Sequence, residues 1–286
     1  MVVYLPLALV WAAFTLHLAG ERRVAVLRRR PRNRQARWRA CSFYAGLLTI
    51  VIALASPIDS LAQKLFWVHM IQHVLLLTIA APLIVLGAPW MSIWRPLPLD
   101  VRRRMARTVA WSPWLAPVRA AGRALGRPLG AWLAFSIDLV LWHIPAAYDL
   151  TLNHVWVHAF EHITFLLFGM LLWAQVLDSP PLRPHLRPDQ RVYYIISAAV
   201  VGWLLSLVLA FAPRPLYPVY AHIANRPGGI SALVDQQLAA GVMLGPGSLT
   251  MTVFVFFGLY RWLESPDDDA QAGSELRRRS AAGGVP

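Results

Sequence analysis

Histidines spaced one helical turn apart are the residues of this sequence best suited to chemistry. His69 and His73 are four residues apart, and His154, His158 and His162 repeat that spacing. Residues at i and i+4 share one face of an α-helix, so each set predicts a histidine stripe. Imidazole binds copper, zinc, iron and nickel. The spacing therefore predicts a metal site between two helices, or a haem site if axial histidines lie on facing helices.

Further polar side chains lie in or near the same stretches. The candidate metal ligands are His69, His73, His143, His158 and His162. The candidate supporting residues are Gln72, Asp138, Glu161, Asp235, Gln236 and Met243. Asp138 could hold a histidine tautomer, carry protons or bond a neighbouring helix. Asp235 could instead cap the last helix, and Met243 could be packing. His154 and His222 are expected to be solvated.

The composition identifies the kind of element that must position these residues. Hydrophobic residues make up 57% of the 286 residues, and charged residues only 14%. Mean hydropathy is +0.50, whereas soluble domains carry roughly 25% charged residues. This excludes a soluble enzyme, a disordered chain and a collagen-like rod. The single cysteine, Cys41, excludes an intramolecular disulfide and a CxxC motif. We therefore expect an all-α, polytopic membrane bundle.

Apolar runs long enough to approach a membrane span divide the chain. The predicted spans are Val2–Ala19, Arg39–Ser56, Leu65–Leu86, Ala131–Pro145, Val155–Leu177, Val192–Ala212 and Leu233–Leu263. Glycines and a proline within 239–247 predict a weak point in the last helix. We expect a seven-helix transmembrane domain over residues 1–264 and a disordered cytoplasmic tail over 265–286.

Arginine distribution predicts the orientation of these spans. Lys64 is the only lysine among 27 basic residues, and the arginines gather mainly in Gly20–Trp38, Gly87–Gly130 and the tail. Cytoplasmic loops carry such an excess, so the N-terminus is expected outside and the C-terminus in the cytoplasm. The basic connection Gly87–Gly130 is expected to hold a short surface helix, with Trp111 and Trp114 at the membrane interface.

This orientation places most histidines toward the outer side. At about 1.5 Å per residue, His69 and His73 fall roughly 8 and 13 Å below the outer surface. Ionisable groups within spans are costly, so each is a functional candidate. The inner halves of the helices hold few such groups, which disfavours an ion path across the whole membrane.

Three blocks of sequence resemble one known family. The stretch Phe66–Pro89, FWVHMIQHVLLLTIAAPLIVLGAP, resembles the signature of the CtaG-type cytochrome c oxidase assembly factors. The segments Leu141–Leu177 and Asp235–Leu249 are similar to that family's middle and last-helix motifs. Leu244 is a departure, because members often have a tryptophan at that position. The matched positions include His69, Gln72, His73, His143, His158, Glu161, His162, Asp235 and Gln236.

The resemblance implies a function as well as a fold. It implies a seven-helix protein of the bacterial plasma (inner) membrane that is needed to build active cytochrome c oxidase, and that is not an enzyme. The implied partners are oxidase subunits or other assembly factors, with membrane lipid and no nucleic acid. The implied cargo is copper, bound by the outer-side histidines. Two alternatives stay open: a haem-binding membrane electron-transfer protein, or a copper or proton transporter that uses Asp138, Glu161 and Asp235.

Overall fold

The computed structural model describes residues 4–28, 33–223, 225–260 and 263. Over these residues the chain is helical, and its only extended pairing is one bridge between Ser179 and Leu182. The predicted all-α class is therefore confirmed. The tail predicted over 265–286 lies outside the described residues.

The helices follow one another with short connections. Their bounds are α1 Tyr4–Arg28, α2 Arg34–Ala55, α3 Pro57–Ala62, α4 Phe66–Val74, the π-helix η1 Leu75–Ala80, α5 Ala81–Gly87, α6 Trp90–Trp94, α7 Leu99–Trp111, η2 Pro113–Leu115, α8 Ala116–Leu125, α9 Pro128–Trp142, α10 Pro145–Asn153, α11 Val155–Ala174, α12 Pro188–Phe211, α13 Pro218–Ala221, η3 Pro227–Gly229 and α14 Ala232–Leu244. Prolines begin α9, α10 and α12, where a missing backbone N–H costs no helical hydrogen bond.

Five described helices are long and apolar enough to cross a membrane. They are Arg34–Ala55, Phe66–Gly87, Val155–Ala174, Pro188–Phe211 and Ala232–Tyr260. Pro113–Leu125 and Pro128–Trp142, bent by 92°, supply a sixth if the pair is one span. The helix over the first predicted run, α1, is not among them. The described helices thus support a multi-pass helical membrane protein with five or six candidate spans. They do not confirm the predicted seven crossings or the predicted orientation.

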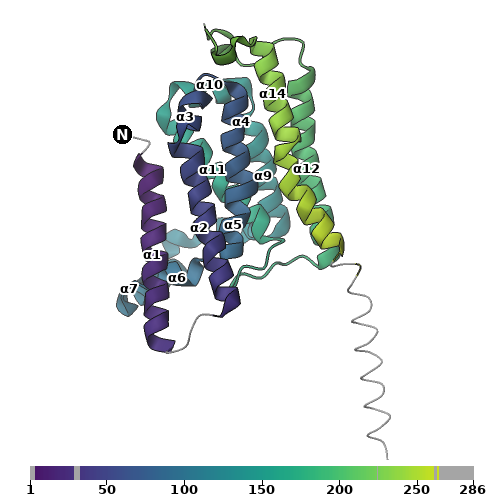
Figure 1. The fold of residues 1–286 in the computed structure, drawn as a ribbon. Coiled ribbons are helices and arrows are strands. Elements are labelled where there is room, and N and C mark those ends of the chain that lie inside the picture. Colours follow the sequence, from purple (N-terminus) through teal and green to yellow (C-terminus); the bar gives the residue numbers. More distant parts are fainter. Residues whose placement is uncertain (1–3, 29–32, 224, 261–262, 264–286) are drawn as a thin grey trace, which may run out of the picture.

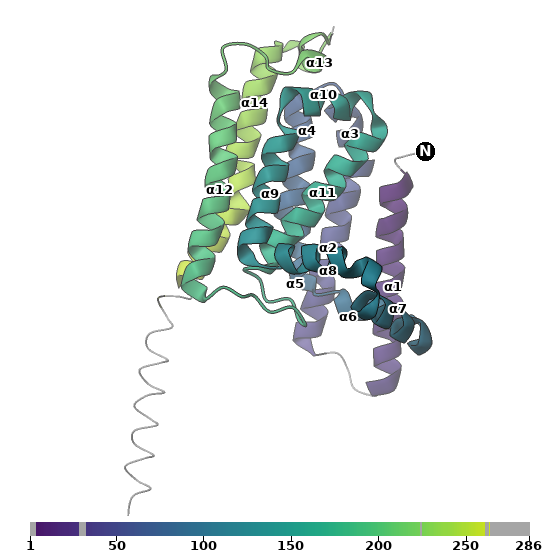
Figure 2. The same cartoon turned by 180° about the vertical axis from the view of Figure 1, so that it is seen from behind.

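The long helices stand roughly side by side (Figures 1 and 2). α12 packs on α14 at one flank, and α1 packs on α2 and α6 at the other. Short helices α3, α10 and α13 lie at one end, while α6, α7 and α8 lie at the opposite end. The predicted surface helix in the basic connection is confirmed, and the structure places α6, α7 and α8 there. Trp111 and Trp114 are 81% and 89% exposed.

The predicted weak point of the last helix is also present. α14 ends at Leu244, and Gly245 leaves helical geometry with φ −83° and ψ −85°. The helix resumes over 246–260.

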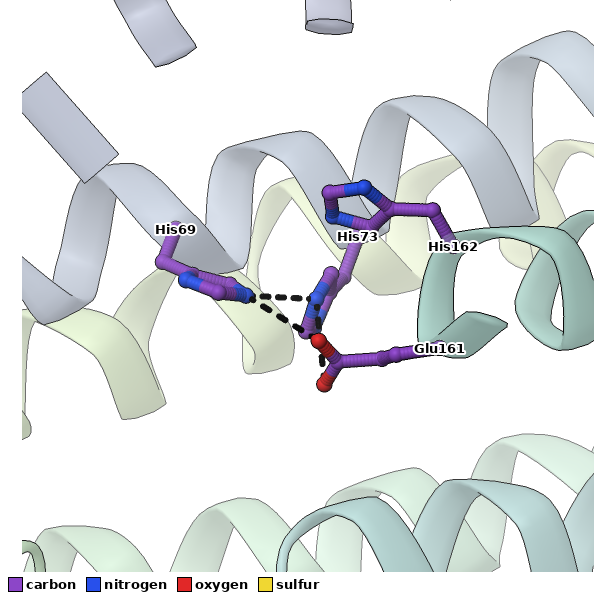
Figure 3. Close-up of side chains that lie close together, drawn as sticks. All are labelled: His69, His73, Glu161 and His162. Carbon is purple, nitrogen blue, oxygen red and sulfur yellow. Dashed lines mark hydrogen bonds and ion pairs between the residues drawn. The ribbon is translucent and has the colours of Figure 1, made fainter. Parts of the chain in front are cut away.

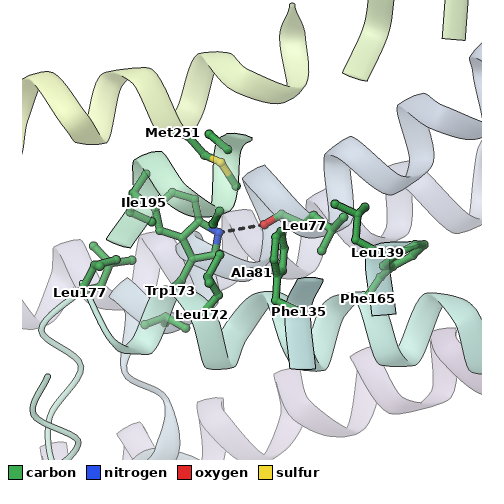
Figure 4. Packing of buried hydrophobic residues seen from close by; sticks show 14 of the residues in the cluster. Leu77, Ala81, Phe135, Leu139, Phe165, Leu172, Trp173, Leu177, Ile195 and Met251 are labelled. Carbon is green, nitrogen blue, oxygen red and sulfur yellow. Dashed lines mark hydrogen bonds between the residues drawn. The ribbon is translucent and has the colours of Figure 1, made fainter. Parts of the chain in front are cut away.

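A π-helical segment interrupts the span that carries His69 and His73. In η1 the backbone hydrogen bonds span five residues instead of four, so that the Ala81 N–H donates to the Leu76 carbonyl. Pro82 has no N–H and cannot continue this pattern to the Leu77 carbonyl. The indole of Trp173, on α11, donates to that carbonyl at 2.9 Å. Figure 4 shows this bond within the apolar core between α5, α9, α11 and α12. One side chain therefore ties α11 to the span at its irregular turn.

Replacing Trp173 with phenylalanine should destabilise the protein. The change keeps an aromatic ring but leaves the buried Leu77 carbonyl unsatisfied, which costs about 1–3 kcal/mol. Thermal unfolding in detergent would measure this loss. Trp114→Phe, at an exposed position, is the matched control and should unfold at the wild-type temperature. Equal unfolding temperatures for both variants would contradict the role given to Trp173.

Candidate metal centre

Four ligand-type side chains converge where α4 faces α11 (Figure 3). One ligand atom from each of His69, His73, Glu161 and His162 lies within 4.8 Å of the others. We call this set the histidine–glutamate cluster. The spacing of His69 and His73 on α4 places both on one face, as predicted, and α11 contributes Glu161 and His162. All four side chains are buried.

The distances within the cluster are short but leave several atoms without partners. Nε2 of His69 lies 2.9 Å from Nε2 of His73. The Glu161 carboxylate oxygens lie 3.7 Å from Nε2 of His69 and 3.6 Å from Nε2 of His73. Among the described residues, neither Glu161 oxygen has a hydrogen-bond partner, nor do Nδ1 of His73 and Nε2 of His162. Buried polar atoms are normally paired, so this concentration of unpaired atoms is typical of a site for an ion.

Two predicted ligands flank the cluster without joining it. The His158 ring centroid lies 5.0 Å from that of His69 and 4.3 Å from that of His162. The His143 ring centroid lies 6.2 Å from that of His73. Nδ1 of His143 lies 2.7 Å from the Leu139 carbonyl, so this nitrogen carries a proton and Nε2 keeps a lone pair. Nε2 of His143 and Nε2 of His158 are both buried without a described partner.

Asp235 plays a different role from the cap considered for its own helix. Ser231 caps α14, because its hydroxyl accepts from the Val234 N–H. Asp235 instead accepts from the backbone N–H groups of Phe66 and Trp67, at 3.1 and 3.0 Å. These groups open α4, whose own N-cap residue supplies no side-chain acceptor. A carboxylate from α14 therefore caps the helix that carries His69 and His73.

A second layer of residues contacts Asp235 and His69 and fixes their positions. Arg226 forms a buried ion pair with Asp235 at 3.3 Å and donates to the Tyr220 carbonyl. The Tyr220 hydroxyl donates to the Ala62 carbonyl at 2.5 Å and lies 3.4 Å from Nδ1 of His69. Burial raises the pKa of Tyr220 well above its ordinary value, so this hydroxyl stays protonated. Because its proton points to Ala62, its oxygen accepts from His69 Nδ1, which leaves the Nε2 lone pair facing the cluster.

The other predicted supporting residues do not touch the cluster's ligand atoms. Gln72 donates to the Ala53 carbonyl at 2.8 Å and to Asp59 at 3.2 Å, and so ties α4 to α2 and α3. Asp138 accepts from the Trp142 indole at 2.9 Å, so the structure does not show it holding a histidine tautomer. Gln236 links the Leu209 carbonyl and the Leu216 N–H, at 2.9 and 2.7 Å.

The two surface histidines behave as expected, and three supporting residues were not anticipated from sequence. His154 and His222 are exposed. Asp59, Tyr220 and Arg226 all lie in the segments between the long helices, at the end of the bundle that holds α3 and α13 (Figures 1 and 2). The sequence signal that could have found them is the presence of charged or phenolic residues in connections that are otherwise poor in charge.

Two cavities border the cluster on different sides. One, of about 60 Å³, has His73 in its wall together with residues of α9, α12 and α14. The other, of about 240 Å³, is apolar and has His162 in its wall together with residues of α1 and α2. The cluster is therefore buried, but two cavities, and not only close-packed side chains, lie beside it.

These features define a multi-pass helical membrane protein with a buried cluster of histidine and carboxylate side chains. The sequence profile of the cytochrome c oxidase caa3 assembly factor family matches residues 22–265. The match covers most of the chain and every residue of the cluster, so the chain belongs to this family, as its resemblance predicted.

The chain is also similar to longer mycobacterial proteins. An uncharacterized protein of Mycobacterium bovis is 23% identical over 238 residues, which cover 83% of this chain and 36% of that protein. An uncharacterized protein of Mycobacterium leprae is 22% identical over 246 residues, which cover 86% of this chain and 37% of that protein. The chain thus spans little more than a third of these relatives. No solved structure matches it.

Replacing Asp235 with alanine should strongly destabilise the end of the bundle where α4 begins. The change uncaps α4 and leaves Arg226 buried without its carboxylate, and breaking such a pair costs about 3–5 kcal/mol. Thermal unfolding in detergent would measure the effect. The control is Asp178→Ala, which removes the carboxylate of an ion pair whose Asp178 side chain is 75% exposed. Its cost should stay below about 1 kcal/mol. Similar losses in both variants would contradict the capping role.

Proposed function

We propose that this protein is a cytochrome c oxidase assembly factor that binds copper at the histidine–glutamate cluster and passes it to an oxidase subunit. The observation that carries the proposal is the convergence of four buried ligand atoms within 4.8 Å of one another. Three imidazoles and a carboxylate suit copper or zinc. Membership of an oxidase assembly family favours copper as the cargo. Binding, rather than catalysis, is the proposed activity.

The unpartnered atoms support a site that both takes up and releases its cargo. His143 and His158 lie next to the cluster, and each keeps a buried Nε2 without a described partner. His158 is only partly buried, so it is the more accessible of the two. We propose that these flanking histidines exchange with the cluster ligands during loading or release, while Tyr220 fixes His69 as a ligand.

The proposed topology places the cluster near the outer surface of the bacterial plasma membrane. We propose seven crossings, with α1 and the helix pair that includes α9 as spans in addition to the five long helices. α4 begins at the end of the bundle that holds α3 and α10, and His69 lies in its first turn. The arginines of α7 and α8 lie at the opposite end. The positive-inside rule then places the cluster toward the outside, where an extracytoplasmic oxidase domain could receive copper.

Copper content of purified variants tests the proposal. Wild-type protein in detergent should bind copper near one ion per chain, whereas His73→Ala and Glu161→Gln should weaken binding by at least about tenfold. His222→Ala removes an exposed histidine and should bind as wild type does. Binding should also weaken in acid, since ligating histidines must be neutral. Oxidase activity in cells that carry each variant should follow the copper affinity.

Three results would change the assignment. Unchanged copper binding and oxidase activity in His73→Ala and Glu161→Gln would contradict it. A Soret band in the purified protein, with no copper requirement, would move the protein to the haem-binding class. Copper uptake into sealed proteoliposomes would instead support a transporter.

A further inference from the structure

A second group of soft metal ligands lies directly beside the cluster. The cavity of about 60 Å³ is walled by Met70, Met243, Met251, His73 and His143. The sequence has only seven methionines, and three of them meet at this one cavity. They come from α4 and from both halves of the last helix, so their convergence is a product of the tertiary fold. We call this the methionine–histidine cavity.

A glycine between two of the methionines helps to keep this cavity open. Met243, Gly247 and Met251 follow one another at four-residue intervals and all line it. Gly247 is buried, and a side chain there would crowd Val74, because an added Cβ would lie 3.3 Å from Cγ2 of Val74. Glycine at the middle position therefore leaves space between the two methionines.

The donor atoms of the cavity differ in kind from those of the cluster. The cavity wall contains thioethers, imidazoles, two hydroxyls and apolar side chains, with no carboxylate among the described lining residues. His143 is 5% exposed, and its Nε2 has a lone pair but no described hydrogen-bond partner. Thioether ligands select Cu(I), and imidazole is also a good ligand for copper. A monovalent ion also costs much less to desolvate than a divalent one, because the Born energy rises with the square of the charge.

We propose that the methionine–histidine cavity is a second metal site, selective for Cu(I), that adjoins the histidine–glutamate cluster through His73. This proposal rests on the proposed function in that copper is the cargo, but it depends on different ligands. His73 belongs to the cluster and also lines the cavity, so the two sites share one histidine side chain. The carboxylate of Glu161 suits the divalent ion, and the thioethers suit the monovalent one.

Competition for Cu(I) under anaerobic, reducing conditions tests this proposal. The double variant Met243→Leu and Met251→Leu should lower Cu(I) affinity by at least about tenfold, because leucine keeps the volume but removes the sulfur. A bathocuproine chelator would report Cu(I) retained by the full-length protein in detergent. The control is Met91→Leu with Met105→Leu, two exposed methionines of α6 and α7, which should bind Cu(I) as wild type does.

X-ray absorption tests directly whether the methionine sulfurs bind copper, which they would not do if Met243 and Met251 only packed against their neighbours. Wild-type protein loaded with Cu(I) should show sulfur at bonding distance from copper, and the Met243 and Met251 double variant should lose it. A wild-type Cu(I) spectrum without sulfur, or unchanged Cu(I) affinity in the double variant, would overturn the proposal.

Cu(II) binding separates this proposal from the assignment of the cluster. The methionine double variant should bind Cu(II) as wild type does, whereas Glu161→Gln should lose Cu(II) affinity. Loss of Cu(I) affinity in the methionine variant, with no effect of Glu161→Gln on Cu(II), would support the cavity and contradict the cluster. The reverse pattern would support the cluster and contradict the cavity.

Discussion

Burial of the Glu161 carboxylate among histidines is the constraint around which the half of the bundle that holds α4 is organised. An isolated carboxylate in an apolar interior costs several kcal/mol even after relaxation, and this one has no described hydrogen-bond donor. Its oxygens lie 3.7 Å from Nε2 of His69 and 3.6 Å from Nε2 of His73. A cation or a shared proton held by these groups would offset the cost. The fold must therefore hold α4 and α11 in a fixed relation, because a shift of one helix would separate the carboxylate from both imidazoles.

Interactions at two levels of the α4–α5 span maintain that relation. At its start, Asp235 of α14 caps α4 and Arg226 neutralises the carboxylate that does so. Deeper in the bundle, Trp173 of α11 satisfies the Leu77 carbonyl that Pro82 leaves without a partner. α14 and α11 thus both form hydrogen bonds to the α4–α5 span that carries His69 and His73. Because α14 also supplies Met243, the same helix provides both the cap of α4 and part of the neighbouring cavity wall.

The sequence predicted the elements better than their contacts. Apolar periodicity and length located the long helices, and i, i+4 spacing placed His69 and His73 on one face. The same rule grouped His158 with His162 as candidate ligands, but facing between helices is a tertiary property, so it did not reveal that Glu161, and not His158, joins His162 in the cluster. Asp235 illustrates the limit most clearly. An acidic residue near a helix start suggests a local cap, whereas its partners are more than 160 residues away in sequence. The π-helical turn likewise depends on Trp173, which is 96 residues from its acceptor.

The most direct test of this account is the position of bound copper in an experimental structure of the copper-loaded protein. Anomalous diffraction at the copper absorption edge would locate the ion independently of any assumption about its ligands. The account predicts a peak at the histidine–glutamate cluster, within bonding distance of His69 or His73 and of Glu161 or His162. A peak confined to surface histidines such as His154 or His222, or no peak in protein that retains copper-dependent function, would contradict it.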